Sequence, residues 1–177
     1  MIPAFEANGA LPVGRFCCSL EEAKQFLVLS PSFQTVENRQ TLWTIFEDSL
    51  RRITDIRCKV PSVFLGGSFV TSQVDPNDID AAYLVVYSTI LTEQTYGKLD
   101  QIFRAINQEN YIDAFQVPWH PTNLKKHEPY YEEYYLERGK WDDFWQRKVS
   151  ETDRIPWQRS HAFPKRGYLE VTVDGYR

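Results

Sequence analysis

The stretch VFLGGSFVTSQVDPNDIDAAYLVV, residues 63–86, decides the fold that we expect. It contains two apolar runs, each of a length typical of a buried strand. The first run ends in a Gly-Gly-Ser turn at 66–68, and the second begins at Asp78 and Asp80. Carboxylates at the start of an apolar strand need solvent or a partner for their charge. The stretch therefore raises the question of what these two acidic residues bind.

Apolar periodicity on both sides of this stretch predicts alternating helices and strands. Ser19 and Glu22 predict a capped helix start, and a long amphipathic helix follows, with Arg39 and Arg51 on its outer face. Pro118 is expected to end the third strand, and Gly139 to break an aromatic-rich segment into two helices. The expected order is helix 19–27, helix 36–56, strand 60–67, strand 79–88, helix 92–110, strand 111–119, two helices within 120–154 and a half-buried edge strand at 166–176. The expected fold is α/β (α+β), with a small mixed β-sheet flanked by helices and an aromatic-rich helical C-terminal segment.

The length of 177 residues predicts a single domain, 1–177. The segment of about 36–117, which carries the glycine turn and the acidic residues, is expected to form its core, with 118–177 as a helical extension and final edge strand. Hydrophobic residues at 42% and charged residues at 25% are typical of a globular protein. The net charge of -4 makes broad nucleic-acid binding an unfavourable interpretation, because such binding needs a basic face.

No run of apolar residues is long enough to cross a membrane, so no membrane partner is expected. The first sixteen residues lack a basic start followed by an apolar block, so no signal peptide is expected. The three cysteines have no metal-ligand spacing, and their odd number suits reduced thiols in a cytoplasmic protein.

Asp78 and Asp80 are separated by one residue, so on a strand their side chains point to the same face while Ile79 points into the core. Two neighbouring carboxylates repel each other, and a divalent cation removes that cost. Asp113 is a third carboxylate, in an otherwise apolar strand. Three carboxylates can hold two Mg²⁺ (or Mn²⁺) ions, the arrangement that supports nucleotidyl transfer.

Gly66, Gly67 and Ser68 have complementary properties. Glycines let a backbone approach a ligand closely, and N–H groups at such a turn attract phosphate. The Ser68 hydroxyl can donate a further hydrogen bond. No lysine follows in the spacing of the ATPase phosphate loop, so that class is excluded.

The pattern LGGS, nine residues, DID and a later lone aspartate resembles the nucleotidyltransferase superfamily of DNA polymerase beta. The resemblance implies that Gly67 and Ser68 hold a triphosphate, that Asp78 and Asp80 ligate both metals, and that Asp113 completes one metal site and helps activate the attacking hydroxyl. The segments MIPAFEANGALPVG, GGSFVTSQVDPNDID and RGYLEV also resemble a family of small uncharacterised bacterial and phage nucleotidyltransferase-like proteins.

The function that follows is transfer of a nucleoside monophosphate from a nucleoside triphosphate, with ATP expected, to a hydroxyl on a protein, an RNA end or a small molecule. The resemblance also implies a toxin–antitoxin or phage-defence setting, with a protein acceptor or cognate toxin as partner. Five cations are candidates for a triphosphate clamp: Lys125, Lys126, Arg159, Lys165 and Arg166.

Two alternatives stay open. The residues 75–78 are also typical of a simple turn, in which case Asp80 caps locally and Asp113 faces solvent. The fold can also serve as a non-catalytic binding module, such as an antitoxin, nucleotide sensor or inhibitor. The aromatic segment 128–148 would then supply a protein-protein contact, because its acidic residues offset its basic ones.

Overall fold

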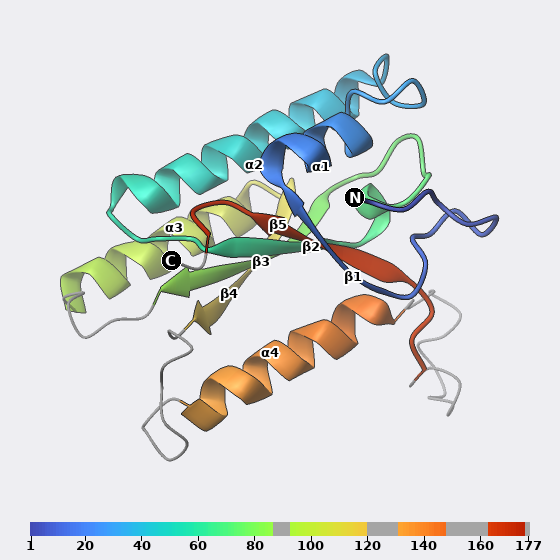
Figure 1. The fold of residues 1–177 in the computed structure, drawn as a ribbon. Helices are drawn as coiled ribbons and strands as arrows, with labels where there is room; N and C mark the ends of the chain where they lie inside the picture. Colours follow the sequence, from blue (N-terminus) through green and yellow to red (C-terminus); the bar gives the residue numbers. More distant parts are fainter. Residues whose placement is uncertain (87–92, 120–130, 148–162, 176–177) are drawn as a thin grey trace.

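A computed structural model describes residues 1–86, 93–119, 131–147 and 163–175. Its centre is a five-stranded mixed sheet in the order β1-β5-β2-β3-β4 (Figure 1). The two outer pairs, β1 with β5 and β3 with β4, are parallel, whereas β2 runs antiparallel to both of its neighbours. The strands are β1 (Gly14–Ser19), β2 (Ser62–Gly66), β3 (Ile79–Val86), β4 (Ile112–Trp119) and β5 (Gly167–Thr172). The fold is therefore α+β, as the sequence predicts.

Helices cover both faces of this sheet. The described helices are α1 (Leu20–Leu27), α2 (Glu37–Asp55), α3 (Glu93–Gln108) and α4 (Tyr131–Gln146), with a short 3-10 turn, η1 (Ser68–Val70), after β2. Helices α1, α2 and α3 pack on one face and contribute to the larger apolar core, while α4 packs on the other face (Figure 1). The smaller core under α4 is mainly aromatic and contains Phe64, Trp119, Tyr134, Trp141, Trp145 and Tyr168.

The first two helices form for the reasons that the sequence indicates. Ser19 accepts a hydrogen bond from the Glu22 backbone, and the Glu22 carboxylate accepts one from the Ser19 backbone, which is the predicted capping box. The predicted apolar face of α2 is buried, with Leu42, Phe46 and Ile53 fully inaccessible to solvent. Arg39, which we expected on the outer face, is also fully buried.

The expected edge position of the last strand is wrong. β5 lies between β1 and β2, and every residue of it except Thr172 is buried. Its polar alternation arises because Tyr168 and Glu170 face α4, where both have hydrogen-bonding partners. The edge is occupied instead by β1, a strand that its own short, partly polar sequence did not predict.

Two expected breaks are also absent. β4 continues past Pro118 to Trp119, which an edge strand tolerates because one side of it needs no ladder hydrogen bonds. α4 is a single helix that passes through Gly139. Buried Trp141 and Trp145 hold the part of α4 beyond the glycine against the sheet. The remainder of the expected two-helix segment lies outside the described residues.

No helix in the described ranges combines the length and the apolar character that a membrane span requires.

Candidate functional site

The glycine turn closes β2 against the carboxylate strand. Gly67 has a φ of 67°, a left-handed conformation that favours glycine. A Cβ atom at Gly67 would overlap with the carboxylate of Asp80, so the turn and this side chain are in direct contact. Ser68 follows at the start of η1 and is partly exposed. The glycine turn and the aspartate that follows it in the motif are therefore also adjacent in space.

The three aspartates come together at the end of two parallel strands. Asp80 is the direct partner of Asp113 in the register of β3 and β4. Asp78 precedes β3, which begins where the Ile79 N–H donates to the Tyr111 carbonyl over 3.0 Å. Ile79 is fully buried in the larger core, as predicted. Because neighbours along each strand alternate faces, Asp80 and Asp113 lie on the side of the sheet that α4 covers.

These carboxylates repel one another. Burial, followed by the charges of Asp78 and Asp113, raises the pKa of Asp80 from 3.8 to about 6. Burial and then the charge of Asp113 raise the pKa of Asp78 as well. The simple-turn alternative predicts neither effect, since isolated turn carboxylates are solvated and do not interact. The arrangement is an acidic site with unbalanced negative charge.

Among the described residues, Arg166 is a cation whose charge acts on Asp80. Its positive charge acts to lower the pKa of Asp80, and Asp80 in turn opposes the lowering of the pKa of Arg166 by burial. The Arg166 Nε donates to the Trp145 carbonyl over 3.2 Å, which holds the side chain beneath the end of α4. Lys165, another candidate clamp residue, is exposed. The candidates Lys125, Lys126 and Arg159 lie outside the described residues.

A divalent cation fits the donor chemistry of this site, because Mg²⁺ is commonly bound through one or two carboxylates while water and phosphate fill the other positions. Asp78, Asp80 and Asp113 are the residues that would hold it. Within the described ranges, however, no three acidic, histidine or cysteine side chains form a ready-made metal cluster. The charges of Asp78 and Asp113 act on Asp80, but the three side chains do not already converge on one point.

Helix α4 also contacts this site, which the sequence did not indicate. A Cβ atom at Gly66 would overlap with the indole ring of Trp145, which is 1% exposed. The two successive glycines therefore make room for different side chains. Trp145 packs against Gly66, and the Asp80 carboxylate packs against Gly67. The contact between Trp145 and a glycine 79 positions earlier has no local sequence signal.

The nine-residue spacer between the turn and the aspartates is held by α2. Arg39 is 0% exposed, and its guanidinium lies 3.8 Å from the centroid of the Phe33 ring. Its hydrogen bonds, of 2.5 to 3.1 Å, go to the carbonyls of Leu27, Phe69, Thr71, Gln73 and Val74. The neighbouring Asn38 donates to the Asp75 carboxylate and the Pro76 carbonyl, each over 2.7 Å. These two residues fix the path of the chain from Ser68 to Asp78.

Comparison with protein families identifies one match over almost the whole chain. Residues 3–172 match the family of unknown function DUF6932, and the chain belongs to that family. Neither the curated proteins nor the solved structures contain a match to the chain.

Proposed function

We propose that this DUF6932 member is a Mg²⁺-dependent nucleotidyltransferase that transfers a nucleoside monophosphate from a nucleoside triphosphate to a hydroxyl acceptor. The observation that carries the proposal is the pairing of Asp80 with Asp113 directly beside Gly67. A glycine turn and an acidic cluster are both needed for transfer, one for the phosphates and one for the metal-dependent chemistry.

Each group in the site has a role in this reaction. The backbone at Gly67 and the Ser68 hydroxyl face the phosphates, and the Arg166 guanidinium offsets negative charge beside Asp80. Asp113, the most exposed of the three carboxylates, positions the acceptor hydroxyl and accepts its proton. The acceptor oxygen then forms a bond to the α-phosphorus while the bond to pyrophosphate breaks. Mg²⁺ bound to the aspartates supplies positive charge to the reacting phosphates.

The acceptor and setting belong to the same proposal. The mild acidity of the chain favours a protein side chain or a small molecule over an RNA end as the acceptor. A toxin–antitoxin or phage-defence setting remains the expectation from the sequence resemblance. The proposed compartment is the cytoplasm, and the free state of Cys17, Cys18 and Cys58 supports it.

One observation favours a second function, a non-catalytic binding module. Helix α4 covers the carboxylate face of the sheet, and Trp145 occupies the space above Gly66. A nucleotide that binds along this face must share it with α4. If α4 never moves, the fold binds a partner or a nucleotide without turnover.

The deciding experiment is transfer of label. The protein is incubated with Mg²⁺ and each of ATP, GTP, CTP and UTP labelled at the α-phosphate, with and without cell lysate. We expect covalent label on an acceptor, and we expect it to be absent with the double variant Asp78→Asn/Asp80→Asn. Asp100→Asn, which removes an exposed carboxylate from α3, is the matched control and should label normally. Absence of transfer with every nucleotide and lysate would exclude the enzyme and leave the binding module.

A further inference from the structure

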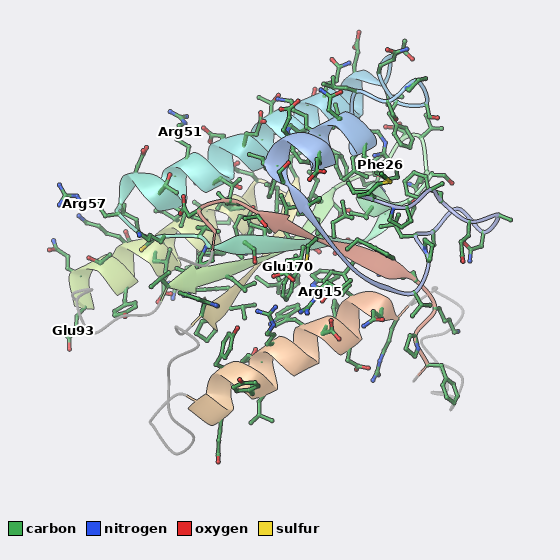
Figure 2. The ribbon with its side chains drawn as sticks, in the orientation of Figure 1. Arg15, Phe26, Arg51, Arg57, Glu93 and Glu170 are labelled. Atoms are coloured by element: carbon green, nitrogen blue, oxygen red, sulfur yellow. The ribbon has the colours of Figure 1, made fainter. Side chains whose placement is uncertain are left out.

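A second polar site lies on the same face of the sheet, beside the acidic one. It is an open pocket of about 240 Å³ between β1 and α4, lined by Arg15, Tyr135, Arg138, Gly139 and Asp142. Figure 2 shows Arg15 and Glu170 in this region between the sheet and α4, whereas Arg51 and Arg57 point outward on the opposite side. β1 and α4 therefore form the walls of the pocket.

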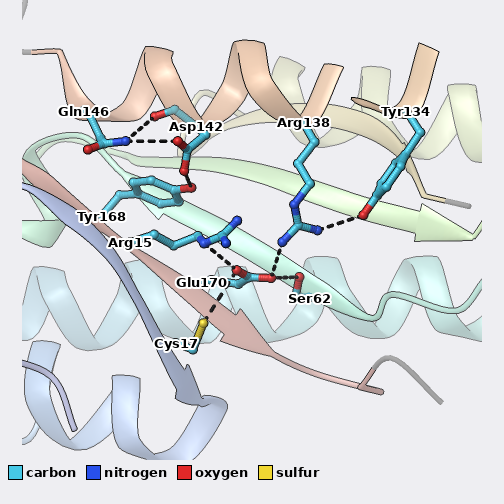
Figure 3. A network of polar contacts seen from close by, with 9 residues as sticks. All are labelled: Arg15, Cys17, Ser62, Tyr134, Arg138, Asp142, Gln146, Tyr168 and Glu170. Atoms are coloured by element: carbon cyan, nitrogen blue, oxygen red, sulfur yellow. Dashed lines mark hydrogen bonds and ion pairs between the residues drawn. The ribbon is translucent and has the colours of Figure 1, made fainter. Parts of the chain in front are cut away.

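The arginines of this pocket are held by a buried carboxylate (Figure 3). The Glu170 side chain is 3% exposed, and its two oxygens pair with Arg15 over 3.2 Å and Arg138 over 3.4 Å. Cys17 and Ser62 also donate to Glu170. One carboxylate thus orients two guanidinium groups toward the same space.

Both arginines keep donors for a ligand. An arginine carries five N–H donors in a fixed fork. Arg15 pairs with Glu170 through Nε, and its two terminal nitrogens have no hydrogen-bond partner among the described residues. The Arg15 side chain is 36% exposed and that of Arg138 is 23% exposed, so both reach the pocket.

Asp142, one turn beyond Arg138 on α4, adds hydrogen-bond acceptors to the wall that faces Arg15. Its Oδ1 accepts from the Tyr168 hydroxyl over 2.5 Å, and its Oδ2 accepts from Gln146 over 3.1 Å (Figure 3). A carboxylate has about four acceptor positions, so roughly two remain for a ligand. The exposed ring of Tyr135, 54% accessible, adds an aromatic surface, and Gly139 adds an open stretch of helix.

The register of the sheet relates this pocket to the acidic site. Arg15 is the partner of Tyr168, and Gly66 is the partner of Asp80. Because Leu65 pairs with Leu169, Tyr168 and Gly66 are also neighbours. Strands are about 4.8 Å apart, so Tyr168 lies roughly 10 Å across the sheet from Asp80. Arg15 itself lies one strand further, roughly 14 Å from Asp80. This distance is of the order of the length of an extended nucleoside triphosphate, and such a nucleotide has to pass Trp145 over Gly66.

We propose that this pocket binds the guanine base of a nucleotide. Guanine presents two acceptors, O6 and N7, that match the fork of an arginine, and its N1 and N2 donors match a carboxylate. Two guanidinium groups and two carboxylates, Glu170 and Asp142, leave the pocket walls without net charge, so a neutral base fits better than a free anion. Adenine has no pair of adjacent acceptors for an arginine, and it lacks the second donor group for a carboxylate. It therefore matches neither kind of group in the pocket.

The inference rests on the proposed function for the identity of the ligand as a nucleotide, and it changes the expected base from adenine to guanine. None of the residues of the glycine turn or the acidic cluster discriminates between bases. The guanine belongs either to the triphosphate substrate or to a separate guanosine nucleotide, and these two sources are distinguished by the affinities below.

Calorimetric titration with guanosine, GTP, adenosine and ATP, in a chelator, tests base recognition without metal or turnover. We expect the guanine compounds to bind at least about tenfold more tightly than the adenine compounds, the discrimination that one bidentate pair provides. GTP that binds more tightly than guanosine, with the difference lost in Arg166→Gln, identifies one nucleotide across both sites, because Arg166 is the cation beside Asp80. Equal affinities for GTP and guanosine identify a separate guanosine site.

Two variants and their controls complete the test. Gly139→Met fills the pocket without altering a charge. Arg15→Gln removes one of the two guanidinium groups, while Arg138 still pairs with Glu170. Both should lower guanosine affinity at least about tenfold. Gly97→Met, at an equally open glycine of α3, and Arg51→Gln, at an exposed arginine, should bind normally.

Equal affinity for guanosine and adenosine, no binding of either, or full binding by Gly139→Met would overturn the inference. So would tighter binding of inorganic pyrophosphate than of guanosine that is lost in Arg15→Gln, because the pocket would then recognise an anion. Guanosine binding in a protein that fails the label-transfer assay would leave this inference intact and refute only the enzyme.

Discussion

The Asp80 carboxylate fills the space that a side chain at position 67 would need. A substitution of Gly67 therefore also displaces a residue of the acidic site. Gly67→Ala would place a methyl group against the Asp80 carboxylate in a backbone conformation, φ 67° and ψ -160°, that is essentially restricted to glycine and costs another residue about 1–3 kcal/mol. We expect the free energy of unfolding to fall by about 2 kcal/mol or more, and nucleotide transfer to fall with it. Thermal or urea unfolding measures the first effect directly.

Gly97→Ala is the matched control for this change. Gly97 lies within α3, and a Cβ atom there meets nothing within 4 Å. Alanine at an open helix position should stabilise the protein by about 0.5–1 kcal/mol. Equal effects of the two substitutions would mean that Gly67 is not constrained by Asp80.

The raised pKa of Asp80 makes the metal-free protein less stable as the pH rises. Its pKa is about 6 in the folded protein and 3.8 in an unperturbed chain, so the folded state binds the proton more tightly. Asp80 therefore favours the unfolded state progressively between about pH 4 and pH 6, and constantly above that range. The effect is of order 1–3 kcal/mol, because each pKa unit corresponds to about 1.4 kcal/mol.

Asp80→Asn removes the charge and should raise the melting temperature at pH 7.5 in a chelator. The difference from the unsubstituted protein should disappear near pH 4, where Asp80 is already protonated. Asp100→Asn, at an exposed position, should show neither behaviour. A variant Asp80→Asn that is less stable than the unsubstituted protein at pH 7.5 would contradict the repulsion between the carboxylates.

Single residues of the acidic site could be predicted because their signals are local. Asp113 stands out in an apolar strand, and the alternation of a strand places Asp80 on one face with Ile79 on the other. Arg39 could not be predicted in the same way. An arginine on a helix normally faces solvent, and its burial depends on carbonyl groups that the spacer contributes only after the whole chain has folded.

At the level of elements, α2 acts on the site through the spacer that it holds. Arg39→Met keeps an unbranched apolar stem but removes the guanidinium, which leaves buried carbonyls of the spacer without a donor. Unsatisfied buried polar groups cost about 1–3 kcal/mol each, so we expect a loss of about 3 kcal/mol or more. Amide hydrogen exchange should become faster in the spacer, residues 69–75, before it becomes faster in α2.

Arg51→Met is the comparison for this element, because Arg51 lies on the exposed face of the same helix. Its cost should stay below about 0.5 kcal/mol. Arg39→Lys keeps the charge but has no guanidinium fork, so its stability should be intermediate. A stability of Arg39→Met equal to that of Arg51→Met would show that the spacer is held by other contacts.

Elements with strong periodicity or a capping pattern were predictable, and elements fixed by tertiary contact were not. The helix after Ser19 has its cap in the sequence. β1 is short, and its residues alternate between exposed and partly buried positions, so only its pairing with β5 defines it. α4 was expected to break at Gly139, but buried tryptophans on its second half outweigh the low helix propensity of one glycine.

For the whole molecule, the sequence predicts the α+β class but not the position of each strand. Glu170 alternates with apolar residues, and such a pattern normally belongs to a strand with one face in solvent. Here the polar face is enclosed by α4 and neutralised by two arginines. Because Arg15 and Arg138 are distant from Glu170 in sequence, neither the burial of Glu170 nor the pocket beside it could be predicted.

The central place of β5 also governs the order in which the protein can be made. Residues 167–172 are synthesised long after β1 and β2, yet they are the only hydrogen-bonded connection between those two strands within the described sheet. Until they leave the ribosome, β1 has no partner strand and β2 has an open edge, which invites contact with other nascent chains. The carboxylate strands β3 and β4 can pair earlier, so the acidic site begins to assemble before the sheet that supports it is complete.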